Sequence, residues 1–242
     1  MKPFKLYLLS LIGTICLTIC SGFSIVENKN LPSFEHAQQL YAQGKYDQCK
    51  SILELIIKEQ PKHYKSIELL GDVFGQLKNW DEALKYYTLL KKSFPNEANY
   101  WYKCGGVLGM KAKEANKFKA LGMIDDIKMS FEKAIVLNPN HIEARWALIE
   151  LYLQLPGIVG GSEKKARIYA NQLMQISKID GYLAFGHIDE YFKRYLKAAE
   201  SYQNAFEIGK SKTAFQKLYQ VYYYKLKDYN KAKKLKEQFE RS

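Results

Sequence analysis

Three prolines, each placed just after an apolar segment, divide the middle of the sequence at a regular distance. They are Pro61, Pro95 and Pro139, and the first two stand 34 residues apart. Proline lacks a backbone N–H and clashes with the preceding helical turn, so it commonly follows a helix end. A fixed period of this length is typical of a repeat made of two helices. Such a pair cannot bury its apolar face alone, so the period predicts a stack of helix pairs.

The segment 64–97 fits this period position by position. Small residues stand at repeat positions 8 and 20, where two antiparallel helices must approach closely, and large ones stand at positions 11, 17 and 24, where they fill the gap to the next pair. The matching residues are Gly71, Ala83, Phe74, Trp80 and Tyr87. In this pattern the segment resembles the tetratricopeptide repeat family. The resemblance implies a right-handed superhelical solenoid.

The same register extends over residues 30–242, so we expect an all-α solenoid of about six helix pairs. The expected units are 30–63, 64–97, 98–141, 142–178, 179–212 and 213–242. Two units are longer than the period. In the third, about ten extra residues predict lengthened helices around a turn near Gly122. In the fourth, Pro156 should end one helix and Ser162 should cap the next. A similar insertion occurs in a group of exported bacterial tetratricopeptide proteins, which this chain resembles.

The N-terminus has the layout of a secretory signal peptide. Lys2 and Lys5 precede an almost continuous apolar run at 6–19, and small residues follow up to Ser24. The run is short for a membrane span, which needs about 20 residues. We therefore expect residues 1–24 to be an export signal, with a retained anchor as the alternative. We expect the protein in the bacterial periplasm or anchored in the envelope.

A second possibility at the N-terminus is lipidation of Cys20. Residues 17–20 resemble the bacterial lipobox, in which the cysteine carries the lipid, although Ile19 departs from the small residue usual at that position. In the alternative interpretation, Cys20 is an apolar residue of a signal that is discarded.

Composition and charge restrict the class of partner. Hydrophobic residues make up 47% and charged residues 26% of the chain, as in ordinary folded proteins. The formal net charge is +12, which favours anionic partners. Many lysines, such as Lys85, Lys128 and Lys164, fall on the expected second helices of the pairs. This basic outer face could contact an anionic membrane or polymer, or could simply be solvated.

Residues that could carry catalysis or bind a metal are sparse. Cys49 and Cys104 fall on interior positions of different pairs, which predicts buried free thiols rather than a disulfide. The four histidines lack metal-ligand spacing, and no nucleophile triad, phosphate loop or dinucleotide motif occurs. We therefore expect no enzyme activity, metal, cofactor, small-molecule substrate or nucleic-acid partner.

The resemblance also implies a binding groove, because in this family the first helix of each pair lines the concave face. Transferring the family's groove positions gives acidic and aromatic residues: Glu68, Asp72, Asn99, Tyr102, Trp146, Glu150, His187, Glu190 and Tyr191. We expect an exported scaffold that holds another protein, as an extended peptide or a helix, in this groove. The alternative is a peripheral envelope component that contacts an anionic surface through its basic outer face.

Overall fold

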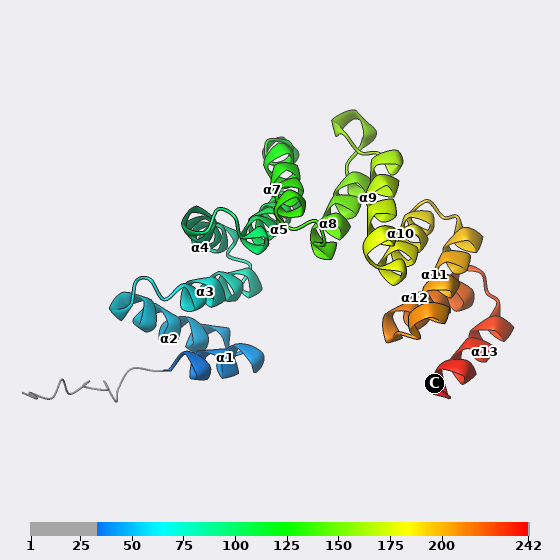
Figure 1. Cartoon of the computed structure of the whole chain (residues 1–242), viewed down its shortest axis with the longest axis horizontal. Helices are drawn as coiled ribbons and strands as arrows, with labels where there is room; N and C mark the ends of the chain where they lie inside the picture. Colours follow the sequence, from blue (N-terminus) through cyan, green and yellow to red (C-terminus); the bar gives the residue numbers. More distant parts are fainter. Residues whose placement is uncertain (1–32, 242) are drawn as a thin grey trace, which may run out of the picture. The chain divides into compact units, whose positions relative to one another are not determined.

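The computed structural model describes residues 33–241, which form helices joined by short turns without any strand (Figure 1). The expected signal peptide at 1–24 and the lipidation site at Cys20 lie outside the described residues, so both stay predictions. Across residues 33–241, no helix is both long enough and apolar enough to span a bilayer.

The helices follow one another as antiparallel pairs along the chain. The first helices are α1 (Phe34–Ala42), α3 (Tyr64–Gln76), α5 (Ala98–Glu114), α8 (Ile142–Gln154), α10 (Lys178–Tyr191) and α12 (Lys212–Gln220), the last continued by the π-helical turn η2 (Val221–Lys225). The second helices are α2 (Tyr46–Glu59), α4 (Trp80–Ser93), α7 (Ile124–Leu137), α9 (Glu163–Ile176), α11 (Tyr195–Gly209) and α13 (Tyr229–Glu240). We propose one repeat unit for each pair.

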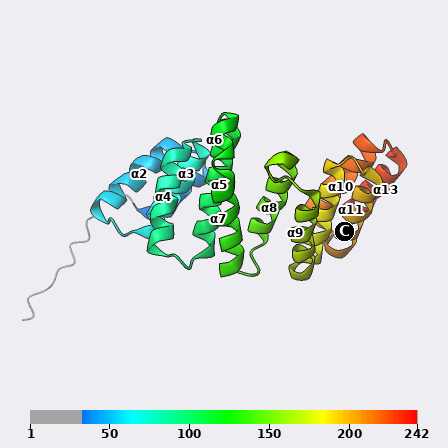
Figure 2. The same cartoon turned by 90° about the horizontal axis from the view of Figure 1, so that it is seen from above.

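Each helix packs against its neighbours in sequence, and the buried residues form three consecutive cores. The first core lies among α1 to α5, the second among α5 to α10, and the third among α10 to α13 (Figures 1 and 2). Burial between sequence neighbours is what stabilises a solenoid, since no central core gathers all the elements. The all-α solenoid expected from the sequence is confirmed.

Glycines and large aromatic side chains meet inside the pairs as the period requires. A Cβ added to Gly71 would lie 2.8 Å from the Cε1 atom of Tyr87, and one added to Gly105 would lie 2.9 Å from Cε1 of Phe131. Such distances are shorter than real carbon contacts, so a larger residue would push the two helices apart. The first and second helices of these pairs therefore need a small residue at this crossing.

The long third unit differs from the expectation. The sequence predicted lengthened helices around a turn near Gly122. Helix α5 is lengthened, with 17 residues, and a turn lies at Gly122, but α5 ends at Glu114, a separate short helix, α6 (Lys117–Leu121), precedes that turn, and α7 has only 14 residues. The break occurs because Asn116 caps α6, its side-chain oxygen accepting a hydrogen bond from the Lys119 N–H at 3.0 Å. Because Asn116 begins α6 in this way, α5 does not continue through it.

The insertion in the fourth unit is folded as expected. Helix α8 ends at Gln154, and the loop that follows contains the 3₁₀ turn η1 (Gly157–Val159). Ser162 caps α9 by accepting a hydrogen bond from the Lys165 N–H at 3.3 Å, while its own N–H donates to the Tyr152 carbonyl at 2.9 Å.

Both cysteines of the described residues are free and buried, as predicted. The Cys49 Sγ atom lies 3.1 Å from the Ala37 carbonyl oxygen, and Cys104 belongs to the same core. Burial raises the pKa of both thiols, which keeps them in the unreactive protonated form.

Candidate functional site

The nine predicted groove residues all lie on first helices, namely α3, α5, α8 and α10. The structure joins most of them through side-chain contacts that run from one first helix to the next. These contacts form an α3–α5 cluster, a recess between α5 and α8, and an α8–α10 cluster.

In the α3–α5 cluster, two of the predicted acids share one lysine. The Nζ atom of Lys103 lies 2.7 Å from Oε1 of Glu68 and 2.9 Å from Oδ1 of Asp72. The hydroxyl of Tyr100 donates to Glu68 at 3.2 Å, and that of Tyr87 donates to Asp72 at 2.5 Å. Burial alone would lower the pKa of Lys103, but the two carboxylates outweigh it and raise the pKa.

Lys103 changes the charge expected here, because it neutralises part of the acidic lining. Lys103 directly follows the predicted groove residue Tyr102 in the sequence. This adjacency is the signal from which the lysine could have been predicted. The family positions transferred from the sequence did not include it, so the expected acidity of α3 was too high.

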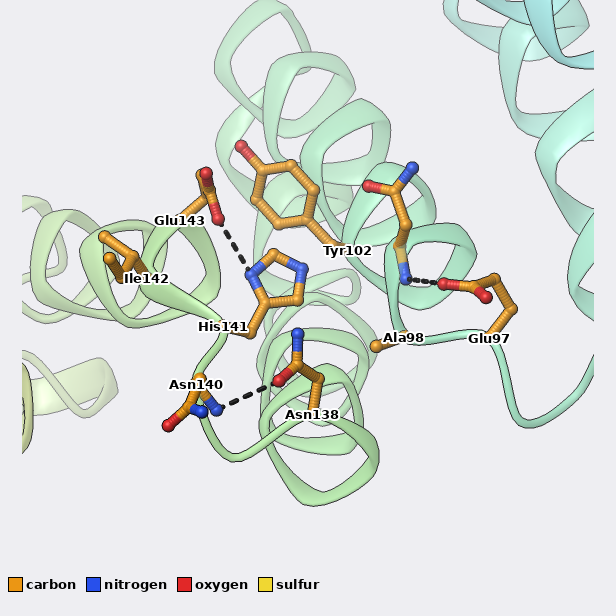
Figure 3. A pocket seen from close by; sticks show the side chains of 9 residues that line it. Glu97, Ala98, Tyr102, Asn138, Asn140, His141, Ile142 and Glu143 are labelled. Carbon is orange, nitrogen blue, oxygen red and sulfur yellow. Dashed lines mark hydrogen bonds and ion pairs between the residues drawn. The ribbon is translucent and has the colours of Figure 1, made fainter. Parts of the chain in front are cut away.

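Asn99 and Tyr102 line a recess of about 400 Å³ between the start of α5 and the turn before α8 (Figure 3). The recess is lined by Glu97, Ala98, Asn99, Tyr102, Asn138, Asn140, His141, Ile142 and Glu143. The Tyr102 and His141 rings lie 5.0 Å apart between centroids. Burial, followed by the negative charge of Glu143, raises the pKa of the Tyr102 hydroxyl. The recess therefore combines one aromatic face with amides and carboxylates.

His141 forms the buried wall of this recess and has a structural role in the fold. It is the N-cap of α8, and its Nδ1 atom accepts a hydrogen bond from the Ala144 N–H at 3.3 Å. The same Nδ1 lies 3.1 Å from Oε2 of Glu143. The cap needs an Nδ1 atom without a hydrogen, whereas a hydrogen bond to the carboxylate needs an N–H at the same atom, so the two contacts compete for one nitrogen.

The α8–α10 cluster contains three of the predicted residues. The indole N–H of Trp146 donates to Oδ1 of Asp180 at 3.3 Å, and its ring lies 6.1 Å from that of His187. The Nε2 atom of His187 lies 2.6 Å from Oε1 of Glu150. This buried nitrogen makes no hydrogen bond of regular geometry among the described residues, so its contact with Glu150 is close but poorly aligned.

The contact with His187 holds the pKa of Glu150 below its usual range, outweighing the opposing effect of burial. A carboxyl group with a lowered folded pKa stabilises the protein above its unfolded pKa of about 4.3, and this contribution is lost as the pH falls. We expect Glu150→Gln to cost less than about 1 kcal/mol at neutral pH, since the side chain is 42% exposed. The difference from wild type in urea midpoint should shrink below pH ~4.3. A difference that stays constant through the acid range would contradict this.

The remaining predicted residues lie at the end of α10. Glu190 accepts a hydrogen bond from the Tyr202 hydroxyl at 2.9 Å, which fixes its carboxylate against α11. Tyr191 is 48% exposed, and its ring meets that of Phe192 edge to face at 5.1 Å. Tyr191 is therefore the most accessible aromatic group among the predicted residues.

A charge network beside α10 was missed by sequence reasoning. The buried Asp189 accepts from Nη2 of Arg167 at 2.5 Å and from Nε of Arg194 at 2.7 Å. Glu163 joins the same two guanidinium groups, with Nε of Arg167 at 2.8 Å. The four residues come from α9, α10 and the turn after α10. Glu163 and Arg167 stand four residues apart, and Asp189 and Arg194 five, but no short sequence spacing connects the first pair with the second. Among residues 33–241, no cluster of His, Cys, Asp and Glu is arranged to hold a metal ion.

Comparison with known proteins finds a repeat family that matches part of the chain. The family model described as "Tetratricopeptide repeat" matches residues 33–63 and 67–97. A search of curated protein sequences finds no match. Proteins with tetratricopeptide repeats generally serve as scaffolds for other proteins, so the matched repeats point to a protein partner.

Solved structures show the same fold at low sequence identity. A thermophilic tetratricopeptide protein of Thermus thermophilus is 17% identical, with a TM-score of 0.61 over 77% of this chain and 95% of that one. One from Parabacteroides merdae is 14% identical, with a TM-score of 0.57 over 84% and 76%. Human IFIT1, solved as a dimer with PPP-AAAA, is 19% identical, with a TM-score of 0.64 over 81% and 46%. At these identities, the likeness concerns the fold alone.

Proposed function

Because this chain carries tetratricopeptide repeats and folds as their solenoid, we propose that it is an exported, non-catalytic scaffold that binds a partner protein along its first helices. The observation that carries the proposal is the series of side-chain contacts from α3 to α10, which leaves Tyr191 exposed at one end. Exposed aromatic side chains on a rigid surface are frequent anchors of protein interfaces.

The recess beside Tyr102 supports a partner with a polar or basic side chain at that point. Its aromatic face, amides and carboxylates suit an ammonium or guanidinium group. The pairing of Glu68 and Asp72 with Lys103 makes the α3 end of the face less selective for basic partners. We therefore place the binding region from the recess to Tyr191, on α5, α8 and α10.

The structure also changes which substitutions can test the proposal. Trp146 packs against two hydrophobic cores, so its replacement would disturb the fold as well as any binding. Tyr191 makes fewer internal contacts and is the better choice. Tyr229, which is 55% exposed on α13, offers a matched tyrosine outside the proposed region.

We expect Tyr191→Ala to weaken recovery of the native partner about tenfold or more, as is typical of an interface anchor. Affinity purification from the cell of origin, quantified against wild type, measures this. Tyr229→Ala should leave recovery unchanged, and circular dichroism should show equal helicity for both variants. Equal recovery with both variants would place the partner elsewhere and overturn the proposed region.

A further inference from the structure

The turns that join the first helix to the second in each pair form one edge of the solenoid, here called the turn edge. It comprises residues 43–45, 77–79, 115–123, 155–162, 192–194 and 226–228. Successive pairs stack with their first helices in the same sense, so these turns lie on the same side. In Figure 2, α6 and the loop between α8 and α9 both lie on the upper side.

Lysine recurs along the turn edge, in or next to every one of these turns. The lysines are Lys45, Lys78, Lys117, Lys119, Lys164, Lys165, Lys193 and Lys227. None of them belongs to an ion pair within residues 33–241. Lys165 lies over the Tyr152 ring, with its Nζ atom 5.3 Å from the ring centroid. The charges of the other lysines are free to act on a partner outside the chain.

Three of these lysines have an unfavourable backbone conformation. Lys78, Lys193 and Lys227 have φ angles of 56°, 59° and 55°, in the left-handed region that disfavours any residue with a Cβ. In the first pair, the corresponding turn has Gly44 at φ 72°. The correspondence is visible in the hydrogen bonds, because Gly44 and Lys78 each donate to the carbonyl three residues earlier. Glycine adopts this backbone conformation without strain. The conformation of the turn therefore does not explain why three other pairs have lysine there.

The two insertions add exposed apolar side chains to the same edge. Phe118 on α6 is 88% exposed, and Ile158 in the loop after α8 is 96% exposed. Both stand on backbone that is held in place: Asn116 caps α6, and the Gly161 N–H donates to the Pro156 carbonyl at 3.1 Å. Nothing in the described packing requires these side chains, which face water at a cost.

The acids of the turn edge are fewer, and several are already paired. Asp81 pairs with Lys111, and Glu163 pairs with Arg194. Asp47, Glu114, Asp125 and Asp126 remain exposed without an ion pair, at the starts of α2 and α7 and at the end of α5. Unpaired lysines therefore outnumber unpaired acids along this edge.

We propose that the turn edge docks on an anionic lipid surface, with Phe118 and Ile158 entering the interfacial layer and the turn lysines approaching headgroup phosphates. Lysines beside an exposed apolar side chain are the combination that binds such surfaces. A nucleic acid fits less well, because an isoleucine cannot stack on a base. The surface differs from the outer face of the second helices and from the proposed protein-binding region.

The test is sedimentation with vesicles of phosphatidylglycerol and phosphatidylcholine, compared with phosphatidylcholine alone, at low and at physiological salt. The protein should lack residues 1–24, whose apolar run would bind lipid by itself. All three cores are made of residues from Phe34 to Phe239, so this form keeps every described packing contact. We expect binding to the anionic vesicles that weakens with salt.

Changing both apolar side chains, in Phe118→Ser with Ile158→Ser, should weaken vesicle binding about 100-fold, since each buried side chain contributes roughly tenfold or more. Val136→Ser is the matched control, because Val136 is 71% exposed at the end of α7, on the edge opposite the turn edge. It should bind as wild type does.

The lysines offer a sharper comparison. Lys193→Gly and Lys210→Gly remove the same charge from the same left-handed conformation, but Lys210 lies in the turn between α11 and α12 on the opposite edge. Lys193→Gly should weaken binding about fivefold, and Lys210→Gly should have no such effect. Equal effects of the two variants, no binding to anionic vesicles, or binding only to an oligonucleotide would each overturn the proposal.

Discussion

Replacing Asp189 with alanine is expected to lower the free energy of unfolding by about 3 kcal/mol, because it removes the buried anion of an ion-pair network. The Asp189 side chain is 6% exposed and contacts Arg167 and Arg194 at 2.5 and 2.7 Å. Without it, two guanidinium groups face each other with only Glu163 between them. The repulsion and the lost hydrogen bonds act together.

The location of the network makes its loss serious for the fold. It ties α9 to α10 and to the turn at Arg194, and α10 is shared by the second and third cores. Urea unfolding followed by circular dichroism measures the change. Asp81→Ala is the control, since Asp81 is 77% exposed in its pair with Lys111 and should cost less than about 1 kcal/mol. Equal costs for the two variants would show that the network contributes nothing beyond a surface ion pair.

Replacing Tyr202 with alanine should cost about 3–5 kcal/mol, the range for deleting a large buried aromatic side chain. Tyr202 is fully buried on α11, and its ring covers Gly186 of α10. Its removal leaves a cavity that the glycine cannot fill, so the crossing of α10 and α11 loses its main contact.

Tyr202→Phe separates packing from hydrogen bonding at this crossing. It keeps the ring and removes only the hydroxyl that donates to Glu190, so the expected cost is about 1 kcal/mol. Chemical unfolding of Tyr202→Ala and Tyr202→Phe, each compared with wild type, measures the free-energy cost of losing the whole side chain and of losing the hydroxyl alone. A phenylalanine variant as unstable as the alanine variant would mean that the Glu190 hydrogen bond, rather than the ring, holds α10 against α11.

The repeat pattern predicted the helices well because it reports packing between neighbours in sequence. Gly71 and Tyr87 occupy the positions that the period assigns, and their contact needs no information from distant parts of the chain. The same reasoning placed Cys49 and Cys104 in the interior. It failed where a local cap decided the outcome, because Asn116 starts a new helix inside a stretch of good helix formers.

The candidate site was harder to predict than the fold. Transferred positions identified which residues lie on first helices, but not what each one contacts. Lys103 pairs with Glu68 and Asp72 across a gap of 31 to 35 residues, and such a pairing depends on side-chain reach between two helices. The Asp189 network likewise depends on three separate elements meeting at one point.

The most direct test of the scaffold is photo-cross-linking in the cell of origin, with p-benzoylphenylalanine in place of Tyr191 in one variant and of Tyr229 in another. Both tyrosines are about half exposed, so the cross-linking groups at the two positions are similarly accessible from solvent. We predict a discrete protein adduct from position 191, which mass spectrometry would map to one segment of the partner, and none from position 229. Adducts of equal yield at both positions, or none at position 191, would contradict a binding region on the first helices.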